Sequence, residues 1–185
     1  MTATATSPDV TTWNIDPVHS TAEFRVKHMM ISNVRGQFTG VTGKLSLDPN
    51  DIVKSQVDAS IDVATVDTRD PNRDTHLKSP DFFDAEKFPT MTFRSSRIVR
   101  KGDGNITVSG PLTIHGAIKE VEFEVEGPTP AVKDPWGNTR IGLSAKTKVD
   151  RRDFGLTFNA ALETGGVLVG EDVHITLELE FVQAA

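Results

Sequence analysis

The chain contains no cysteine in its 185 residues. This absence excludes disulfide bridges, thiolate zinc sites, iron–sulfur clusters and cysteine nucleophiles, so the fold has to be stable through packing alone. No stretch approaches the roughly 20 apolar residues that a membrane-spanning helix requires. The first residues also lack the basic start and the apolar run of a secretory signal. We therefore expect a cytoplasmic protein with no integral membrane segment.

Positive charge and catalytic motifs are also scarce. Lysine and arginine total 20 against 26 aspartate and glutamate residues, which gives a formal net charge of -6. Such a surface repels nucleic acid and an anionic membrane over most approaches, and we expect neither as a partner. The sequence has no G-x-S-x-G element, phosphate loop, dinucleotide fingerprint or H-E-x-x-H pair. We therefore expect no enzyme, no catalytic residues and no obligatory cofactor.

The length of the chain allows one substantial core, which predicts a single domain. Residues 1–12 are rich in Thr, Ala and Ser, and we interpret them as a flexible tail. Across residues 13–183, apolar and polar residues alternate with the period of a half-buried strand. In residues 119–126, Val121, Phe123 and Val125 share one face, and glutamates occupy the other. The glutamate face has to point into water.

Several further segments repeat this alternation, and short turns rich in Gly, Asn, Asp and Pro separate them. Short turns favour antiparallel neighbours in chain order. The apolar parity changes within residues 34–47, which predicts a bulge or sharp bend near Gly40. The pattern predicts an all-β fold: a single antiparallel barrel of about eight strands, closed because closure removes exposed edges.

One segment breaks the strand pattern. Ser79 is a suitable N-cap, Pro80 suits the first helical position, and Phe88-Pro89 is a stop signal. We therefore expect a short helix over residues 79–87, within a long connection around residues 70–88. Phe82 and Phe83 on this helix are either core residues or part of a lid over one end of the barrel.

A few polar residues could contact a ligand or a metal ion. His28 continues an inward row with Phe24 and Val26, so its ring is either hydrogen-bonded inside the barrel, in contact with a ligand, or a metal ligand. A metal site from His19, His28 and His76 has no standard spacing, and we predict none. Arg73 and Arg152 could each clamp an anionic group or form local ion pairs.

An ordered series of motifs resembles the YceI-like, polyisoprenoid-binding proteins of bacteria over residues 13–182. The matching stretches are Trp13-Asn14-Ile15-Asp16-Pro17-Val18-His19-Ser20, Phe24 with His28, Val34-Arg35-Gly36-Gln37-Phe38, Arg73-Asp74-Thr75-His76-Leu77, Ser79-Pro80-Asp81-Phe82-Phe83-Asp84, Phe88-Pro89, Phe93-Arg94-Ser95, Gly110-Pro111-Leu112-Thr113-Ile114-His115-Gly116 and Arg152-Asp153-Phe154-Gly155. The resemblance implies a lipocalin-like barrel whose elongated apolar cavity binds an isoprenoid chain, such as a polyprenyl lipid or an isoprenoid quinone. Storage, transport and sensing of this lipid are all compatible with the sequence.

Inward-facing parity and the resemblance together predict a set of ligand-binding residues. They are Phe24, Val26, His28, Phe38, Ile61, Arg73, Phe82, Phe83, Met91, Phe93, Leu112, Phe123, Leu143, Arg152, Phe154 and Phe158. Of these, His28, Arg73 and Arg152 are the candidates for the polar end. Two alternatives stay open: an enzyme that uses interior His28 on a small apolar substrate, and a protein-interaction module with a Glu-rich outer face. A homodimer is also compatible with the sequence.

Overall fold

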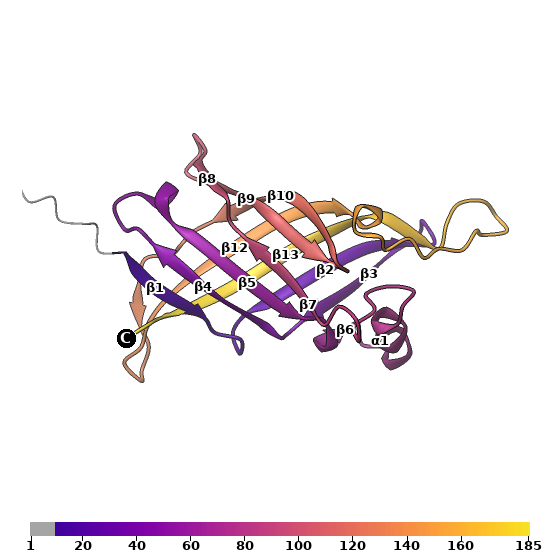
Figure 1. The fold of residues 1–185 in the computed structure, drawn as a ribbon, viewed down its shortest axis with the longest axis horizontal. Coiled ribbons are helices and arrows are strands. Elements are labelled where there is room, and N and C mark those ends of the chain that lie inside the picture. Colours follow the sequence, from indigo (N-terminus) through magenta and orange to yellow (C-terminus); the bar gives the residue numbers. More distant parts are fainter. Residues whose placement is uncertain (1–9) are drawn as a thin grey trace, which may run out of the picture.

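The computed structural model describes residues 10–185 and contains one antiparallel sheet that curls into a long barrel (Figure 1). Residues 1–9, most of the predicted tail, lie outside the described part of the chain. Thr11 and Thr12 were also assigned to that tail, and this assignment is wrong. They begin the first strand, where they pair with Leu47 and Ser46. Backbone pairing to a neighbouring strand thus outweighs their low hydrophobicity.

The described chain consists mainly of strands, with one α-helix and three 3-10 turns between them. The strands are β1 (Thr11–Ile15), β2 (Thr21–His28), β3 (Ser32–Phe38), β4 (Val41–Leu47), β5 (Gln56–Asp62), β6 (Val66–Asp67), β7 (Thr90–Arg94), β8 (Arg97–Arg100), β9 (Ile106–Ile114), β10 (Ala117–Glu126), β11 (Val132–Lys133), β12 (Thr139–Asp150) and β13 (Val169–Gln183). The helices are α1 (Pro71–Lys78) and the 3-10 turns η1 (Ile52–Lys54), η2 (Val63–Thr65) and η3 (Arg151–Phe154).

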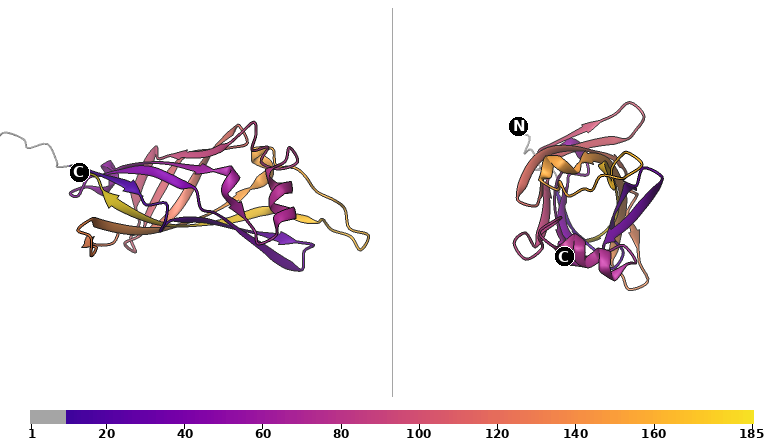
Figure 2. Two further views of the ribbon diagram at one scale, coloured as in Figure 1. Left: turned by 90° about the horizontal axis from the view of Figure 1, so that it is seen from below. Right: turned by 90° about the vertical axis from the view of Figure 1, so that its right-hand side faces the viewer.

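Eight strands close the ring, in the order β1, β4, β5, β7, β9, β10, β12 and β13, with β13 returning to β1. The ring strands keep their order along the chain, although β2 and β3 intervene between β1 and β4, and β6 and α1 between β5 and β7. The long strand β13 pairs with β1 near its end and with β2 nearer its start. Strands β2 and β3 therefore extend the same barrel wall toward the end where α1 lies (Figure 2). The predicted eight-stranded antiparallel barrel is confirmed.

The barrel wall bends at two breaks between strands, one between β1 and β2 and one between β3 and β4. Residues 16–20 separate β1 from β2, and there the Ser20 hydroxyl receives the Glu180 amide at 3.0 Å and lies 3.3 Å from the Glu180 carbonyl oxygen, to which it donates. Thr39 and Gly40 separate β3 from β4, and the Gly40 amide donates to Thr65 Oγ1 at 3.0 Å. The bend predicted near Gly40 is confirmed, and in both breaks hydroxyl groups replace lost ladder partners.

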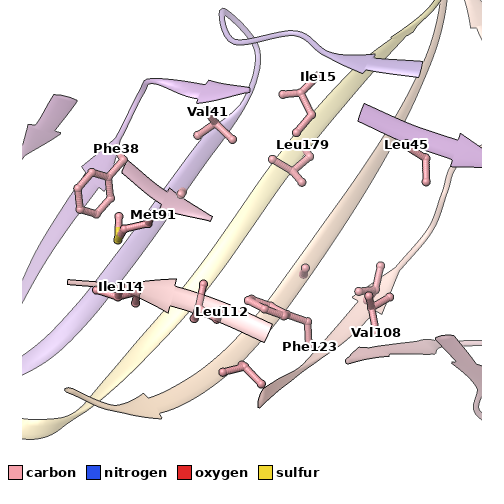
Figure 3. Close-up of a cluster of buried hydrophobic side chains, with 14 of the residues drawn as sticks. Ile15, Phe38, Val41, Leu45, Met91, Val108, Leu112, Ile114, Phe123 and Leu179 are labelled. Atoms are coloured by element: carbon pink, nitrogen blue, oxygen red, sulfur yellow. The ribbon is translucent and has the colours of Figure 1, made fainter. Parts of the chain in front are cut away.

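Buried hydrophobic side chains from all around the ring point inward, as the alternation predicted (Figure 3). On β10, Val121, Phe123 and Val125 are buried while the intervening glutamates are exposed. Phe181 on β13 is completely buried. The core is therefore the inside of the barrel, and polar strand positions face outward.

The helix lies earlier than the sequence predicted. Helix α1 covers Pro71–Lys78, because the Asp70 carboxylate accepts hydrogen bonds from the amides of Asn72 at 3.0 Å and Arg73 at 3.2 Å. Ser79, predicted as the N-cap, instead caps the C-terminus by donating from its hydroxyl to the His76 carbonyl. Two cap-plus-proline signals stand nine residues apart in this connection. The first forms the helix, and the predicted segment 79–87 forms turns.

Candidate ligand cavity

The barrel encloses a cavity of about 400 Å³ that is lined almost entirely by apolar side chains. This volume lies within the range of about 300–1,000 Å³ that is typical of small-molecule sites. Residues from every strand of the ring except β1 contribute to its wall. The lumen is therefore not filled by the protein's own side chains.

Every predicted ligand-binding residue except Arg152 lines this cavity. The lining includes Phe24, Val26, His28, Phe38, Ile61, Arg73, Phe82, Phe83, Met91, Phe93, Leu112, Phe123, Leu143, Phe154 and Phe158. Alternation along the strands points most of these side chains inward, and the connection that contains α1 brings Arg73, Phe82 and Phe83 to the same cavity. Contact between these residues and a lipid stays a prediction, since their placement shows only that they are available.

Small residues make room for the cavity and for its walls. Ala59 and Ala145 line the lumen, where their side chains leave space that a larger residue would take. Gly36 lies opposite Phe24 in the β2–β3 pair, and a Cβ atom at Gly36 would lie 2.4 Å from the Phe24 ring. Gly110 has a different role, because its Cβ would lie 1.9 Å from the Arg94 carbonyl oxygen. It permits a close approach of two strands and does not line the lumen.

Aromatic rings cover the end of the cavity beside α1. The ring of His76 lies 5.0 Å from that of Phe82 and 4.9 Å from that of Phe158, with both contacts edge-to-face. Phe83 packs edge-to-face on Phe38 at 5.6 Å. These rings come from β3, α1, the turns after α1 and the loop before β13, so four separate segments meet at this end of the cavity. This arrangement fits the lid interpretation of Phe82 and Phe83.

Three polar side chains of the lining, Arg73, His28 and His76, belong to α1 and to the end of β2. The Arg73 side chain donates from Nε to Thr68 Oγ1 and from Nη2 to the Thr68 carbonyl, both at 2.8 Å. No carboxylate among residues 10–185 lies within ion-pair distance of Arg73. His28 and His76 also line the cavity, and His76 pairs with Asp81 at 2.8 Å. A ligand with an apolar chain and a polar head would therefore meet its polar contacts beside α1.

Arg152 was predicted at the polar end, and this prediction is wrong. Its guanidinium is exposed on the outer wall and pairs with Asp150 at 2.6 Å and Glu171 at 2.7 Å. Hydrogen bonding from Arg152 lowers the pKa of Asp150 to about 2, and the Asp150 carboxylate in turn raises the pKa of Arg152. Local ion pairs with neighbouring acids hold the side chain outside the lumen.

The neighbouring Arg151 lines the cavity instead. It is 5% exposed and donates to the carbonyls of Gly170 at 2.7 Å, Leu156 at 2.5 Å and Val169 at 3.2 Å. Burial lowers the pKa of Arg151. Leu143, Ala145 and Val149 occupy the same inward row of β12, so extending this parity by two residues would have identified Arg151.

The histidine set considered for a metal is not brought together. His28 and His76 line the cavity, whereas His19 pairs with Asp16 at 2.9 Å in a separate cluster that includes Glu180. Arg140 already neutralises that cluster by donating from Nη1 to Asp16 at 2.6 Å and to Glu180 at 2.5 Å. The hydrogen bond from Arg140 holds the pKa of Asp16 well below its ordinary value. The cluster thus acts as a clamp between the β1–β2 turn, β12 and β13.

Among the described residues, no helix is long and apolar enough to cross a membrane. The only α-helix in this part of the chain is α1, with eight residues.

Comparison with known proteins identifies the fold and a family. The chain matches the YceI-like domain family over residues 13–181. It is 37% identical over 173 residues to a UPF0312 protein of Staphylococcus epidermidis, which covers 93% of this chain and 98% of that protein.

Two solved structures share the architecture. Burkholderia cenocepacia BcnA has a TM-score of 0.76 at 24% identity, covering 90% of this chain and 98% of that one. A polyisoprenoid binding domain from Saccharophagus degradans, implicated in plant cell wall breakdown, has a TM-score of 0.66 at 14% identity, covering 95% of this chain and all of that one. At these identities the likeness shows the fold alone.

Proposed function

Because this chain belongs to the YceI-like family, we propose that it binds a long-chain isoprenoid lipid in the barrel cavity, for storage, transport or sensing. A polyprenyl lipid and an isoprenoid quinone both have the required chemistry. The observation that carries the proposal is the continuous apolar lumen of about 400 Å³. The polyisoprenoid binding domain from Saccharophagus degradans, which shares the fold, adds support.

The energetics favour a chain-shaped apolar ligand. Removing one five-carbon isoprene unit from water contributes roughly 4 kcal/mol before costs, at about 0.8 kcal/mol per carbon. Losses of translational, rotational and chain freedom offset much of this gain. A few well-enclosed units are thus enough for tight binding, and chain length is selected by the depth of the lumen.

The polar head of the ligand belongs at the α1 end in this proposal. Arg73 has no acidic partner among the described residues, and its Nη1 makes no hydrogen bond to them, so a hydroxyl, carbonyl or phosphate oxygen could accept from it. His28 lies in the same part of the lining. These two residues orient the head, while the apolar wall supplies the affinity.

We propose binding without turnover. Catalysis by His28 would require an acid, base or nucleophile within hydrogen-bond distance of its ring. No side chain among residues 10–185 makes such a contact with His28. Incubation of the purified protein with candidate isoprenoids should return the ligand chemically unchanged, and a new product that disappears in His28→Ala would establish an enzyme instead.

The direct test is mass spectrometry of organic extracts from the natively expressed, purified protein. The proposal expects a stoichiometric isoprenoid that Leu143→Arg removes, because this change places an unpaired charge in the apolar lumen. Lys146→Arg, on the exposed face of the same strand, is the matched control. If Leu143→Arg folds and retains the lipid, or if the wild type contains none and takes up none, the proposal fails.

A further inference from the structure

Two segments extend beyond the barrel at the end beside α1. They are the β2–β3 turn, residues 29–31, and the loop of residues 155–168 before β13 (Figure 2). The Met29 amide donates to the Leu168 carbonyl at 2.8 Å, so the segments touch. Leu168 and the flanking residue His28 both line the cavity. This protruding tip therefore adjoins the end of the cavity beside α1.

The β2–β3 turn exposes apolar side chains at a cost to its own stability. Met29, Met30 and Ile31 are 39%, 55% and 79% exposed, the only three adjacent large hydrophobic residues exposed in the described chain. Met29 and Met30 have φ values of 50° and 62°. Turns with two positive φ values strongly favour Asn-Gly, since other residues lose roughly 1–2 kcal/mol there. Two methionines in this place are unfavourable for folding, and local rules broken without a gain inside the fold point to a functional site.

A row of basic residues crosses the outer wall next to this tip. The strand register places Lys148, His174, Arg25 and Arg35 side by side on β12, β13, β2 and β3. Arg25 and Arg35 lie directly opposite each other, an arrangement in which like charges destabilise a sheet. Neither pairs with an acidic group anywhere in residues 10–185. Lys148, at one end of the row, pairs with Asp172 at 3.0 Å. Although the whole chain carries a net charge of -6, Arg25 and Arg35 are therefore the two cations of this row that have no counterion among the described residues.

The spacing of these features matches a lipid interface. Arg25 stands four residues before Met29, and Arg35 stands four residues after Ile31. At about 3.3 Å per residue along a strand, both arginines lie roughly 13 Å behind the turn. Interfacial segments bury apolar groups about 5–10 Å into the boundary between headgroups and acyl chains. Inserting the tip thus brings the arginines to the level of lipid phosphates. Glu163 is the one acidic residue on the neighbouring loop tip, residues 159–168.

We propose that this end of the barrel docks on an anionic lipid bilayer. Met29, Met30 and Ile31 enter the acyl boundary, and Arg25 and Arg35 contact lipid phosphates. The docked orientation points this end of the cavity at the membrane, so an isoprenoid that enters here passes between bilayer and lumen without crossing water. This transfer step rests on the proposed function, whereas docking itself does not.

Sedimentation with lipid vesicles tests the apolar part of the proposal. The change Met29→Asn, Met30→Gly and Ile31→Thr should weaken binding to phosphatidylcholine–phosphatidylglycerol vesicles at least about tenfold, because burying one such side chain is worth that much. The melting temperature should stay equal or rise, since the turn receives its preferred residues. Trp136→Ser is the matched control, because Trp136 is 82% exposed beside the opposite end of β13 and should not affect binding.

The basic row is tested by its dependence on lipid charge. Arg25→Gln with Arg35→Gln should weaken binding to the anionic vesicles about 25-fold, from about fivefold for each cation near an anionic surface. Folding stability should not fall, because a repulsive pair is removed. The paired change Arg100→Gln with Lys101→Gln, at the end of β8 and in the turn that follows it, should leave binding unchanged.

The outcomes separate docking from ligand binding. The proposal is overturned if wild-type protein fails to bind anionic vesicles, or if the tip and arginine variants bind as well as wild type. It is also overturned if size-exclusion chromatography shows a wild-type dimer that the tip variant dissociates, since the tip would then contact a second copy. A protein that retains isoprenoid delivered from detergent but ignores vesicles refutes docking alone. A protein that docks but never holds isoprenoid refutes the proposed function alone.

Discussion

Replacing Ala145 with phenylalanine is expected to shorten the isoprenoid chain that the barrel accepts. Ala145 lies on β12, is 4% exposed, and lines the cavity between Val125 and Leu177 of the neighbouring strands. Its methyl group is part of the wall of the cavity of about 400 Å³. An aromatic ring at this position therefore enters the volume that a ligand would occupy.

The size of the effect follows from the number of carbons displaced. Phenylalanine adds about six carbon atoms, close to one five-carbon isoprene unit, whose burial contributes roughly 4 kcal/mol before binding costs. Much of this gain is offset by the cost of ordering the ligand on binding. We therefore expect the longest chain that the wild type accepts to bind the variant at least about tenfold more weakly. The preferred chain should become shorter by about one unit, while shorter chains keep their affinity.

Reconstitution with isoprenoid quinones of increasing chain length, quantified by mass spectrometry, provides the measurement. Chemical denaturation of the ligand-free protein provides a second one. Ring insertion into a vacant lumen should leave stability unchanged or raise it, whereas overpacking a solid core costs about 1–3 kcal/mol. Ala131→Phe, on an exposed loop, is the control. A destabilised Ala145→Phe with an unchanged chain-length profile would refute the inference of an accessible lumen.

Three further predictions concern the adjacent arginines Arg151 and Arg152, the N-cap of α1 and the clamp at Arg140. Arg151→Met should lower the free energy of unfolding by about 2–4 kcal/mol, because three carbonyls lose their hydrogen-bond donor. Arg152→Met should change it by less than about 1 kcal/mol and leave ligand binding intact. Denaturation curves of the two variants test this difference. Asp70→Ala should cost about 1 kcal/mol through loss of the α1 N-cap and speed ligand release, measured by stopped-flow exchange, and an unchanged release rate would contradict the lid assignment. Arg140→Ala should cost roughly 3 kcal/mol at neutral pH because Asp16 keeps an uncompensated charge. The folded-state pKa of Asp16 is lowered, so the stability that its ionised carboxylate contributes is complete above the ordinary pKa of 3.8 and is lost as the pH falls below that value. The difference in unfolding free energy between wild type and Arg140→Ala should therefore shrink in acid. A difference that does not depend on pH would contradict the clamp.

Some parts of the site could be predicted from the sequence because they depend only on residue order. Alternation places every second side chain of a strand on one face, so Leu143 and Phe123 could be assigned to the lumen without knowing their partners. The same rule carried through η3 would have selected Arg151. Charge does not distinguish the two arginines, and the ion pairs of Arg152 with Asp150 and Glu171 hold its side chain outside.

The position of helix α1 could not be predicted from the sequence. Asp70-Pro71 and Ser79-Pro80 are both valid starting signals, and local preference does not separate them. In the folded chain the Asp70 carboxylate accepts two amide hydrogen bonds, and Asp74 accepts from the amide and hydroxyl of Thr68. These contacts tie α1 to the segment after β6, so the first signal forms the helix.

By itself, the amino-acid sequence determined an antiparallel barrel of inward apolar and outward polar rows, the bend at Gly40, and most of the lumen wall. Periodicity and turn chemistry are local, and they survive without knowledge of the partner strands. Only the tertiary structure decided which end carries the aromatic lid, which of two adjacent arginines is buried, and where Arg25 and Arg35 meet across β2 and β3. Those outcomes depend on register and on contacts between distant segments, which residue order does not specify.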